Sequence, residues 1–259
     1  MATEQPDQPE NSTDRSTGSA ADSVELAAWA FVLPFLAYML IASRTPELTP
    51  ASIDDVSVGW YFRLVIIEVI VTIALLLYWS RRILATFPFR IDVWGFVVGV
   101  IGVVAWIGLC GLQIEKQALE MIGLGDWLPD RPGFNPFAQI TDTTVRSVFL
   151  FFRFTMLALM VPIIEELFLR GFLLRYIDES QSDWHRIKLS ELGTKAIWAA
   201  AIYGVLTHPS EAIAAAVWFG MVSVLMLRTG KFWNCVVAHG VTNLLLGLYV
   251  IYYSAWQLW

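Results

Sequence analysis

Seven runs of apolar residues, most of them long enough to cross a membrane as helices, dominate this sequence. A spanning helix needs about 20 apolar residues, and in lipid every backbone polar group has to be hydrogen-bonded within the protein. The predicted fold class is therefore all-α: a polytopic transmembrane helix bundle of seven or eight spans with a polar intramembrane cavity. The predicted spans are residues 25–43, 60–80, 93–112, 146–175, 194–208, 210–228 and 232–253.

Composition excludes several other classes of protein. Hydrophobic residues make up 57% of the chain and charged residues only 15%, with a mean hydropathy of +0.60. Soluble domains contain roughly 45–50% apolar residues, so a soluble enzyme or a disordered protein is excluded. The net charge of −6 without a basic patch excludes nucleic acid as a partner, and we expect membrane lipids instead. The two cysteines, Cys110 and Cys235, form neither a disulfide framework nor a CxxC metal site.

Three regions follow from the pattern of polar and apolar segments. Residues 1–23 are polar and acidic, which predicts a disordered cytoplasmic tail. Residues 24–144 hold three transmembrane helices and an outer loop rich in glycine and proline, with a short interfacial helix near 114–122. Residues 145–259 hold the remaining helices. Lys and Arg number ten in the segments on the side of the N-terminus and four on the opposite side, which predicts a cytoplasmic N-terminus.

The sequence also predicts a kink within one span and a turn between two others. Pro162 lies within the long fourth span and should kink it, because proline cannot donate the helical hydrogen bond. The fifth span ends at His208, and Ser210 can cap the helix that follows.

Charged side chains inside the fourth span are the first candidates for chemistry. Each charge costs roughly 2.5–3.5 kcal/mol to insert into hydrocarbon, so those present are usually paired or functional. Glu166 and Arg170 are four residues apart and can pair along one helix face. Glu165 points about 100° away from Glu166, and a carboxylate in an apolar site suits a general base.

Polar residues on two other spans lie at a similar depth. His239 and Asn243 are four residues apart on the last span, and His208 closes the fifth. At 1.5 Å per residue, Glu165 lies about 15 Å, His208 about 20 Å and His239 about 10 Å from the cytoplasmic ends of their spans. A shared polar cavity is favoured over separate structural roles. Arg63 and Glu68 can pair or reach the interface, while Arg153 can line the cavity or meet Glu68; structural roles are favoured for these three.

These residues carry a resemblance to a known family. EELFLR at 165–170 resembles the EExxxR motif, and HGVTN at 239–243 the HxxxN motif, of the CPBP (CAAX protease and bacteriocin-processing) intramembrane proteases. The stretch VVAHGVTNLLLGLYV resembles the exosortase-associated, CAAX prenyl protease-related branch. The family's middle motif is FxxxH, whereas here Gly204 lies four residues before His208 and Tyr203 lies five before. The resemblance covers about 145–259, as a CPBP-like catalytic helix bundle.

The resemblance implies an intramembrane endopeptidase that hydrolyses a peptide bond in a membrane-associated or lipidated protein. Glu165 and His208 would activate a water molecule, and His239 and Asn243 would stabilise the oxyanion. Arg170 would hold Glu166, both as supporting residues. No cofactor is expected, although a zinc-dependent version with Glu165, His208 and His239 as ligands is a real alternative.

Other functions stay open at this stage. A non-proteolytic membrane scaffold or chaperone in protein sorting could use the same cavity, and a transporter is less favoured because no inverted repeat is evident. The expected partners are a membrane-anchored protein or peptide substrate and an exosortase or protein-sorting system. The expected location is the bacterial inner membrane, as a multi-pass protein.

Overall fold

The computed structural model describes residues 14–45, 55–127, 133–179 and 184–258. Those residues form helices and connecting loops with no strand among them, which confirms the all-α class. The helices are α1 Asp14–Ala42, α2 Asp55–Thr86, α3 Val93–Leu112, α4 Ile114–Met121, α5 Pro136–Gln139, α6 Thr143–Thr155, α7 Val161–Glu166, α8 Leu174–Asp178, α9 Thr194–Thr207, α10 Ala212–Thr229 and α11 Phe232–Tyr253.

Each predicted span coincides with a helix. Five segments of the described chain are long and apolar enough to cross a membrane by themselves: Gly59–Thr86, Val93–Met121, Thr143–Asp178, Pro209–Thr229 and Phe232–Tyr253. The other two predicted spans correspond to the shorter apolar segment Ala28–Ala42 and to α9, which has 14 residues. The short interfacial helix expected near 114–122 is α4.

The N-terminal tail differs in part from its prediction. Helix α1 begins at Asp14, within the stretch 1–23 that was expected to be disordered, and residues 1–13 lie outside the described residues. Ala20 and Ala21 lie in this added part of the helix, and alanine has the highest intrinsic helix propensity.

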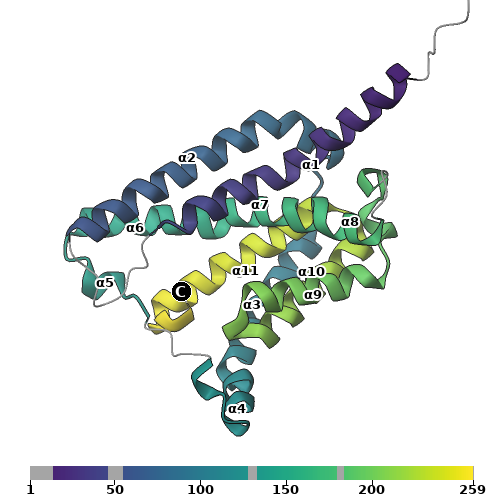
Figure 1. The fold of residues 1–259 in the computed structure, drawn as a ribbon. Helices are drawn as coiled ribbons and strands as arrows, with labels where there is room; N and C mark the ends of the chain where they lie inside the picture. The colour runs from purple at the N-terminus through teal and green to yellow at the C-terminus, as the bar shows by residue number, and fades with distance from the viewer. Residues whose placement is uncertain (1–13, 46–54, 128–132, 180–183, 259) are drawn as a thin grey trace, which may run out of the picture.

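The run α6–α8 lies in the middle of the bundle, and the other helices pack on two of its sides (Figure 1). Helices α1 and α2 contact each other and one side of this run, and α11 contacts the other side. Helix α11 packs in turn against α3, and α10 lies against α9, α3 and α11. Side chains on α6–α8, α9 and α11 therefore face a common interior.

Helices α3 and α11 approach each other closely through small residues. Gly95, Gly99 and Gly102 are all buried on α3, and a Cβ at Gly99 would lie 2.7 Å from Val241 Cβ and 2.9 Å from the Ala238 carbonyl oxygen. Membrane helices use such small residues to bring their backbones together. This packing fixes the helix that carries His239.

The starts of α3 and α11 are tied together by a polar cluster. Asp92 Oδ2 lies 2.7 Å from Lys231 Nζ, and Asp92 Oδ1 accepts hydrogen bonds from Asn234 Nδ2 at 2.8 Å and from the Trp94 amide at 3.0 Å. The hydrogen bond from Lys231 is the largest of the causes that lower the pKa of the Asp92 carboxyl. The cluster caps α3 and holds α11 at its first turn.

The predicted cap of α10 is wrong. Pro209–Glu211 form a 3₁₀ turn, α10 begins at Ala212, and Ser210 is not the N-cap. The Ile213 amide donates instead to Glu115 Oε1, at 2.7 Å, from α4. A carboxylate from a distant helix therefore satisfies a donor that the preceding turn leaves open.

Gly99→Val tests the close packing of α3 on α11. The added side chain would overlap Val241, so we expect a loss of about 1–3 kcal/mol in stability and a lower thermal midpoint of the detergent-solubilised protein. Gly108→Val on the same helix is the control, because a Cβ there meets nothing within 4 Å. Equal midpoints for the two variants would show that the contact does not hold the helices together.

Candidate active site

Two π-helical segments flank the short helix that carries both glutamates. The run from Thr143 to Asp178 changes from α-helix to π-helix over Met156–Met160, returns to α-helix over Val161–Glu166, and is again π-helical over Leu167–Leu173. Pro162 is the second residue after the first π-helical segment, so the helix is irregular next to the proline that was predicted to kink it. Such segments are rare and often lie at functional sites, because they redirect side chains.

Glu166 and Arg170 form the predicted pair, and both side chains are fully buried. Arg170 Nη1 donates to Glu166 Oε2, while Nη2 donates to the Phe219 carbonyl oxygen at 3.3 Å and approaches Ser223 Oγ at 3.5 Å. The second oxygen, Glu166 Oε1, lies 3.1 Å from His239 Nδ1. One carboxylate thus joins the fourth and last predicted spans and sets the orientation of the imidazole.

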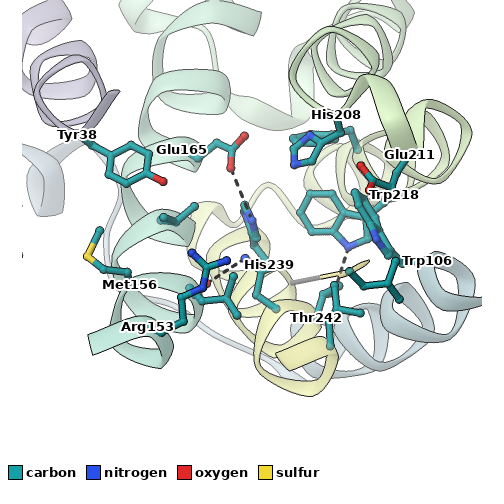
Figure 2. A pocket seen from close by; sticks show the side chains of 16 residues that line it. Tyr38, Trp106, Arg153, Met156, Glu165, His208, Glu211, Trp218, His239 and Thr242 are labelled. Carbon is teal, nitrogen blue, oxygen red and sulfur yellow. Dashed lines mark hydrogen bonds and ion pairs between the residues drawn. The ribbon is translucent and has the colours of Figure 1, made fainter. Parts of the chain in front are cut away.

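Glu165 points away from that pair, towards α9 and α11. Its Oε1 accepts a hydrogen bond of 2.9 Å from the Tyr203 hydroxyl, and its Oε2 lies 3.7 Å from His239 Nε2. The side chain is 9% exposed. Because Tyr203 binds one oxygen, the other faces the imidazole and the space around it (Figure 2).

That space is a cavity of about 280 Å³. All four residues predicted to act in catalysis line it: Glu165, His208, His239 and Asn243. They come from α7, the end of α9, and α11. The structure therefore brings together the carboxylate, the two imidazoles and the amide that the sequence places on three separate helices.

His208 and Asn243 are held by local contacts. The His208 ring lies edge-on to Trp106, with 5.5 Å between ring centroids, and its Nδ1 is 2.9 Å from Thr207 Oγ1. Asn243 Nδ2 donates one hydrogen bond of 2.9 Å to the Leu157 carbonyl oxygen, and the amide nitrogen has a second hydrogen to donate.

Sequence analysis left the role of Tyr203 undetermined and did not select Tyr38, Trp218 or Glu211. Tyr38, Trp218 and Glu211 line the cavity, and the indole ring of Trp218 lies 4.7 Å from the His239 ring, centroid to centroid. Tyr203 occupies the aromatic position of the middle motif, displaced by one residue, which was its only signal. The other three have no motif, because they approach the site only through tertiary packing.

The zinc alternative has no matching ligand cluster. In the part of the chain that the structure describes, no three His, Cys, Asp or Glu side chains are grouped so that they could hold a metal ion. Glu165, His208 and His239 share the cavity without forming such a group, so their arrangement does not fit a bound metal ion. Metal dependence stays a prediction.

A bundle of apolar helices around a polar cavity is typical of an integral membrane protein with an internal site. In a comparison with protein families, residues 147–245 match the family described as Rce1-like, type II CAAX prenyl endopeptidase. This match is consistent with the CPBP resemblance of the same segment. No curated protein and no solved structure matches the chain. The exosortase-associated branch stays a prediction.

Tyr203→Phe tests the contact between the tyrosine hydroxyl and Glu165. Hydrogen bonds to charged groups contribute about 1.5–3 kcal/mol, so loss of this one should lower kcat about tenfold or more, with little change in KM. The measurement is cleavage of a membrane-anchored reporter peptide by the reconstituted protein. Tyr249→Phe, which removes a hydroxyl outside the cavity, is the control, and wild-type kcat in Tyr203→Phe would contradict the prediction.

Proposed function

We propose that this protein is an intramembrane endopeptidase of the CAAX-protease type, which hydrolyses a peptide bond in a membrane-associated or lipidated protein. The observation that supports the proposal is the convergence of Glu165, His208, His239 and Asn243 on one cavity, inside the segment that matches the protease family. The family match accounts for hydrolysis of peptide bonds in general. The roles of the individual side chains are our inference.

In this mechanism Glu165 is the general base. A water molecule in the cavity, bound between Glu165 and His208, gives a proton to the carboxylate as its oxygen attacks the scissile carbonyl carbon. The hydrogen bond from Tyr203 leaves Glu165 Oε2 as the oxygen that faces the cavity. The protonated Glu165 then returns the proton to the nitrogen of the leaving amine, which completes hydrolysis.

His239 and Asn243 stabilise the oxyanion of the tetrahedral intermediate. They lie one helical turn apart on α11 and both line the cavity. The contact between His239 Nδ1 and Glu166 leaves Nε2 directed into the cavity, and Asn243 has a free amide hydrogen. Donors fixed in this way act on the charge that develops during the reaction without having to reorganise.

Glu166 and Arg170 have a positioning role in this proposal. Arg170 neutralises Glu166, and Glu166 in turn orients the His239 ring. A non-proteolytic scaffold would also need these residues for folding, but it would not need the carboxylate of Glu165. We further propose that the protein is a multi-pass protein of the bacterial inner membrane with a cytoplasmic N-terminus, acting on substrates of a protein-sorting system.

Glu165→Gln is the direct test of the proteolytic function. The amide cannot accept the proton of water, so we expect cleavage to fall by about 10²–10⁴-fold while expression and thermal midpoint are kept. Cleavage is measured with purified, reconstituted protein, and N-terminal proteomics of cells identifies termini of membrane proteins that disappear in the variant. Glu120→Gln, on the exposed side of α4, is the control. Undiminished cleavage by Glu165→Gln would rule out its role as base.

Metal removal tests the metal-free form of the mechanism. Because Glu165 and His208 are proposed to activate water without a Lewis acid, activity should survive dialysis against EDTA and 1,10-phenanthroline. Metal analysis of the active protein should give well under one zinc per chain. Loss of activity that added zinc restores would support the zinc-dependent alternative with Glu165, His208 and His239.

A further inference from the structure

A buried carboxyl group on α2, for which the sequence favoured a structural role, has no part in the proposed mechanism. Glu68 is 5% exposed, and Thr72, one helical turn further along α2, is fully buried. Residues four apart lie on one helix face, so the two polar side chains are neighbours. Across the described parts of the chain, Thr72 Oγ1 has no hydrogen-bond partner. Ionisable groups at membrane depth are costly to keep and generally mark a function, which makes Glu68 a candidate for one.

Tyr38 on α1 connects this carboxyl group with the active site. It lines the cavity, and Figure 2 shows its hydroxyl directed towards the interior. The Tyr38 hydroxyl is within electrostatic range of both Glu68 and Glu165. A phenol hydroxyl can accept one hydrogen bond while it donates another, which is what a group that passes on protons needs.

Arg153 on α6 balances the charge of Glu68. The two groups are within electrostatic range of each other, and Arg153 is also within range of Tyr38. A neighbouring cation offsets part of the cost of keeping a carboxylate ionised in an apolar bundle. Glu68 is therefore placed to accept a proton when a group in the cavity has to lose one.

Hydrolysis at this site leaves a proton on the catalytic base. Once Glu165 has passed the water proton to the leaving amine, the other product is a carboxylic acid, R–COOH. The ionised Glu165 faces that product and takes its proton, which gives R–COO⁻ and protonated Glu165. In that form Glu165 cannot accept a proton from the next water molecule, so the cycle needs a further acceptor.

We propose that Tyr38 and Glu68 form a proton relay that returns Glu165 to its ionised form after each turnover. This inference rests on the proposed function. The O–H bond of protonated Glu165 breaks and its proton goes to the Tyr38 oxygen, while the O–H bond of Tyr38 breaks and that proton goes to Glu68. The net change is the movement of one proton from Glu165 to Glu68, with no oxidation or reduction. Glu68 then gives the proton to water, and the departed amine takes one up from water.

Water completes the path between these groups. The cavity has a volume of about 280 Å³, and a water molecule takes up about 30 Å³ in the liquid, so several molecules fit beside Tyr38. A bound water needs about two to four polar partners. The hydroxyls of Tyr38 and Thr72 and the carboxylate of Glu68 are partners of that kind, so water held among them can carry the proton.

The test separates the first turnover from those that follow. Reconstituted protein is mixed rapidly with a membrane-anchored reporter peptide, and cleavage is followed from the first turnover into the steady state. Because the relay acts only after hydrolysis, Glu68→Gln and Tyr38→Phe should cleave the first peptide at the wild-type rate and later ones about tenfold or more slowly. Product should therefore appear in a burst that equals the number of active sites, which wild type does not show.

A small weak acid provides a second readout. In Glu68→Ala, formate can enter the space left by the side chain and accept the proton in its place. Added formate should raise the steady rate of this variant severalfold and leave the wild-type rate unchanged. Nitrate is an anion of similar size that does not accept a proton at neutral pH, so it should have no such effect. An equal response to both anions would show that only a negative charge is missing, and it would overturn the relay.

Tyr61→Phe is the matched control. Tyr61 lies within electrostatic range of Glu68, but it packs against Phe149 and does not line the cavity. This variant should show no burst and should keep the wild-type steady rate. If Glu68→Gln does not fold, Tyr38→Phe decides, because it removes a single oxygen atom from a side chain that faces the cavity.

The possible failures can be told apart. If Glu68→Gln and Tyr38→Phe slow the first and the later turnovers equally, the two residues act on structure and the inference is overturned. Wild-type steady rates in both variants overturn it as well, and each of these results leaves the proposed function standing. A wild-type protein that cleaves no peptide even in the first turnover overturns both.

Discussion

The charge compensation between Glu166 and Arg170 is the interaction on which the rest of the site depends. Two ionised groups can lie deep in an apolar bundle only when each neutralises the other and their remaining hydrogen-bonding atoms have partners. Here the Phe219 carbonyl oxygen, Ser223 and His239 serve as those partners, while Arg170 Nε is buried without a hydrogen bond to any described residue. The same contacts fix the imidazole next to Glu165, so the groups that hold the bundle together also shape its cavity.

Local spacing was enough to predict part of this arrangement. The four-residue intervals Glu166–Arg170 and His239–Asn243 place side chains on one helix face whatever the rest of the fold, and each run of apolar residues coincides with a helix. The hydrogen bond from Tyr203 to Glu165, by contrast, depends on how α9 packs against α7. The Glu115 cap of α10 joins residues 98 positions apart. No local pattern encodes such contacts, which explains why Ser210 was the wrong choice and why Tyr203 had no assigned role.

The first three helices have no recognisable motif, yet they complete the site. Trp106 from α3 and Tyr38 from α1 line the cavity, although both lie outside the matched segment 147–245. Thr242 Oγ1 donates to the Gly99 carbonyl oxygen at 2.9 Å and lies 3.1 Å from the Trp218 indole nitrogen, so α3 also supports the wall next to His239. The matched segment contains the residues proposed for the chemistry but only part of the wall that encloses them.

Because π-helical segments lie on either side of Glu165, the geometry of the site depends on the exact number of residues in this helical run. A π turn takes up more residues than an α turn, so each segment shifts the angular position of everything that follows it. Deleting one residue from Met156–Met160 would preserve every motif letter while rotating the glutamates by about 100° relative to α6. Insertions and deletions in Met156–Met160 or Leu167–Leu173 should therefore be tolerated far less readily than substitutions of one apolar residue for another.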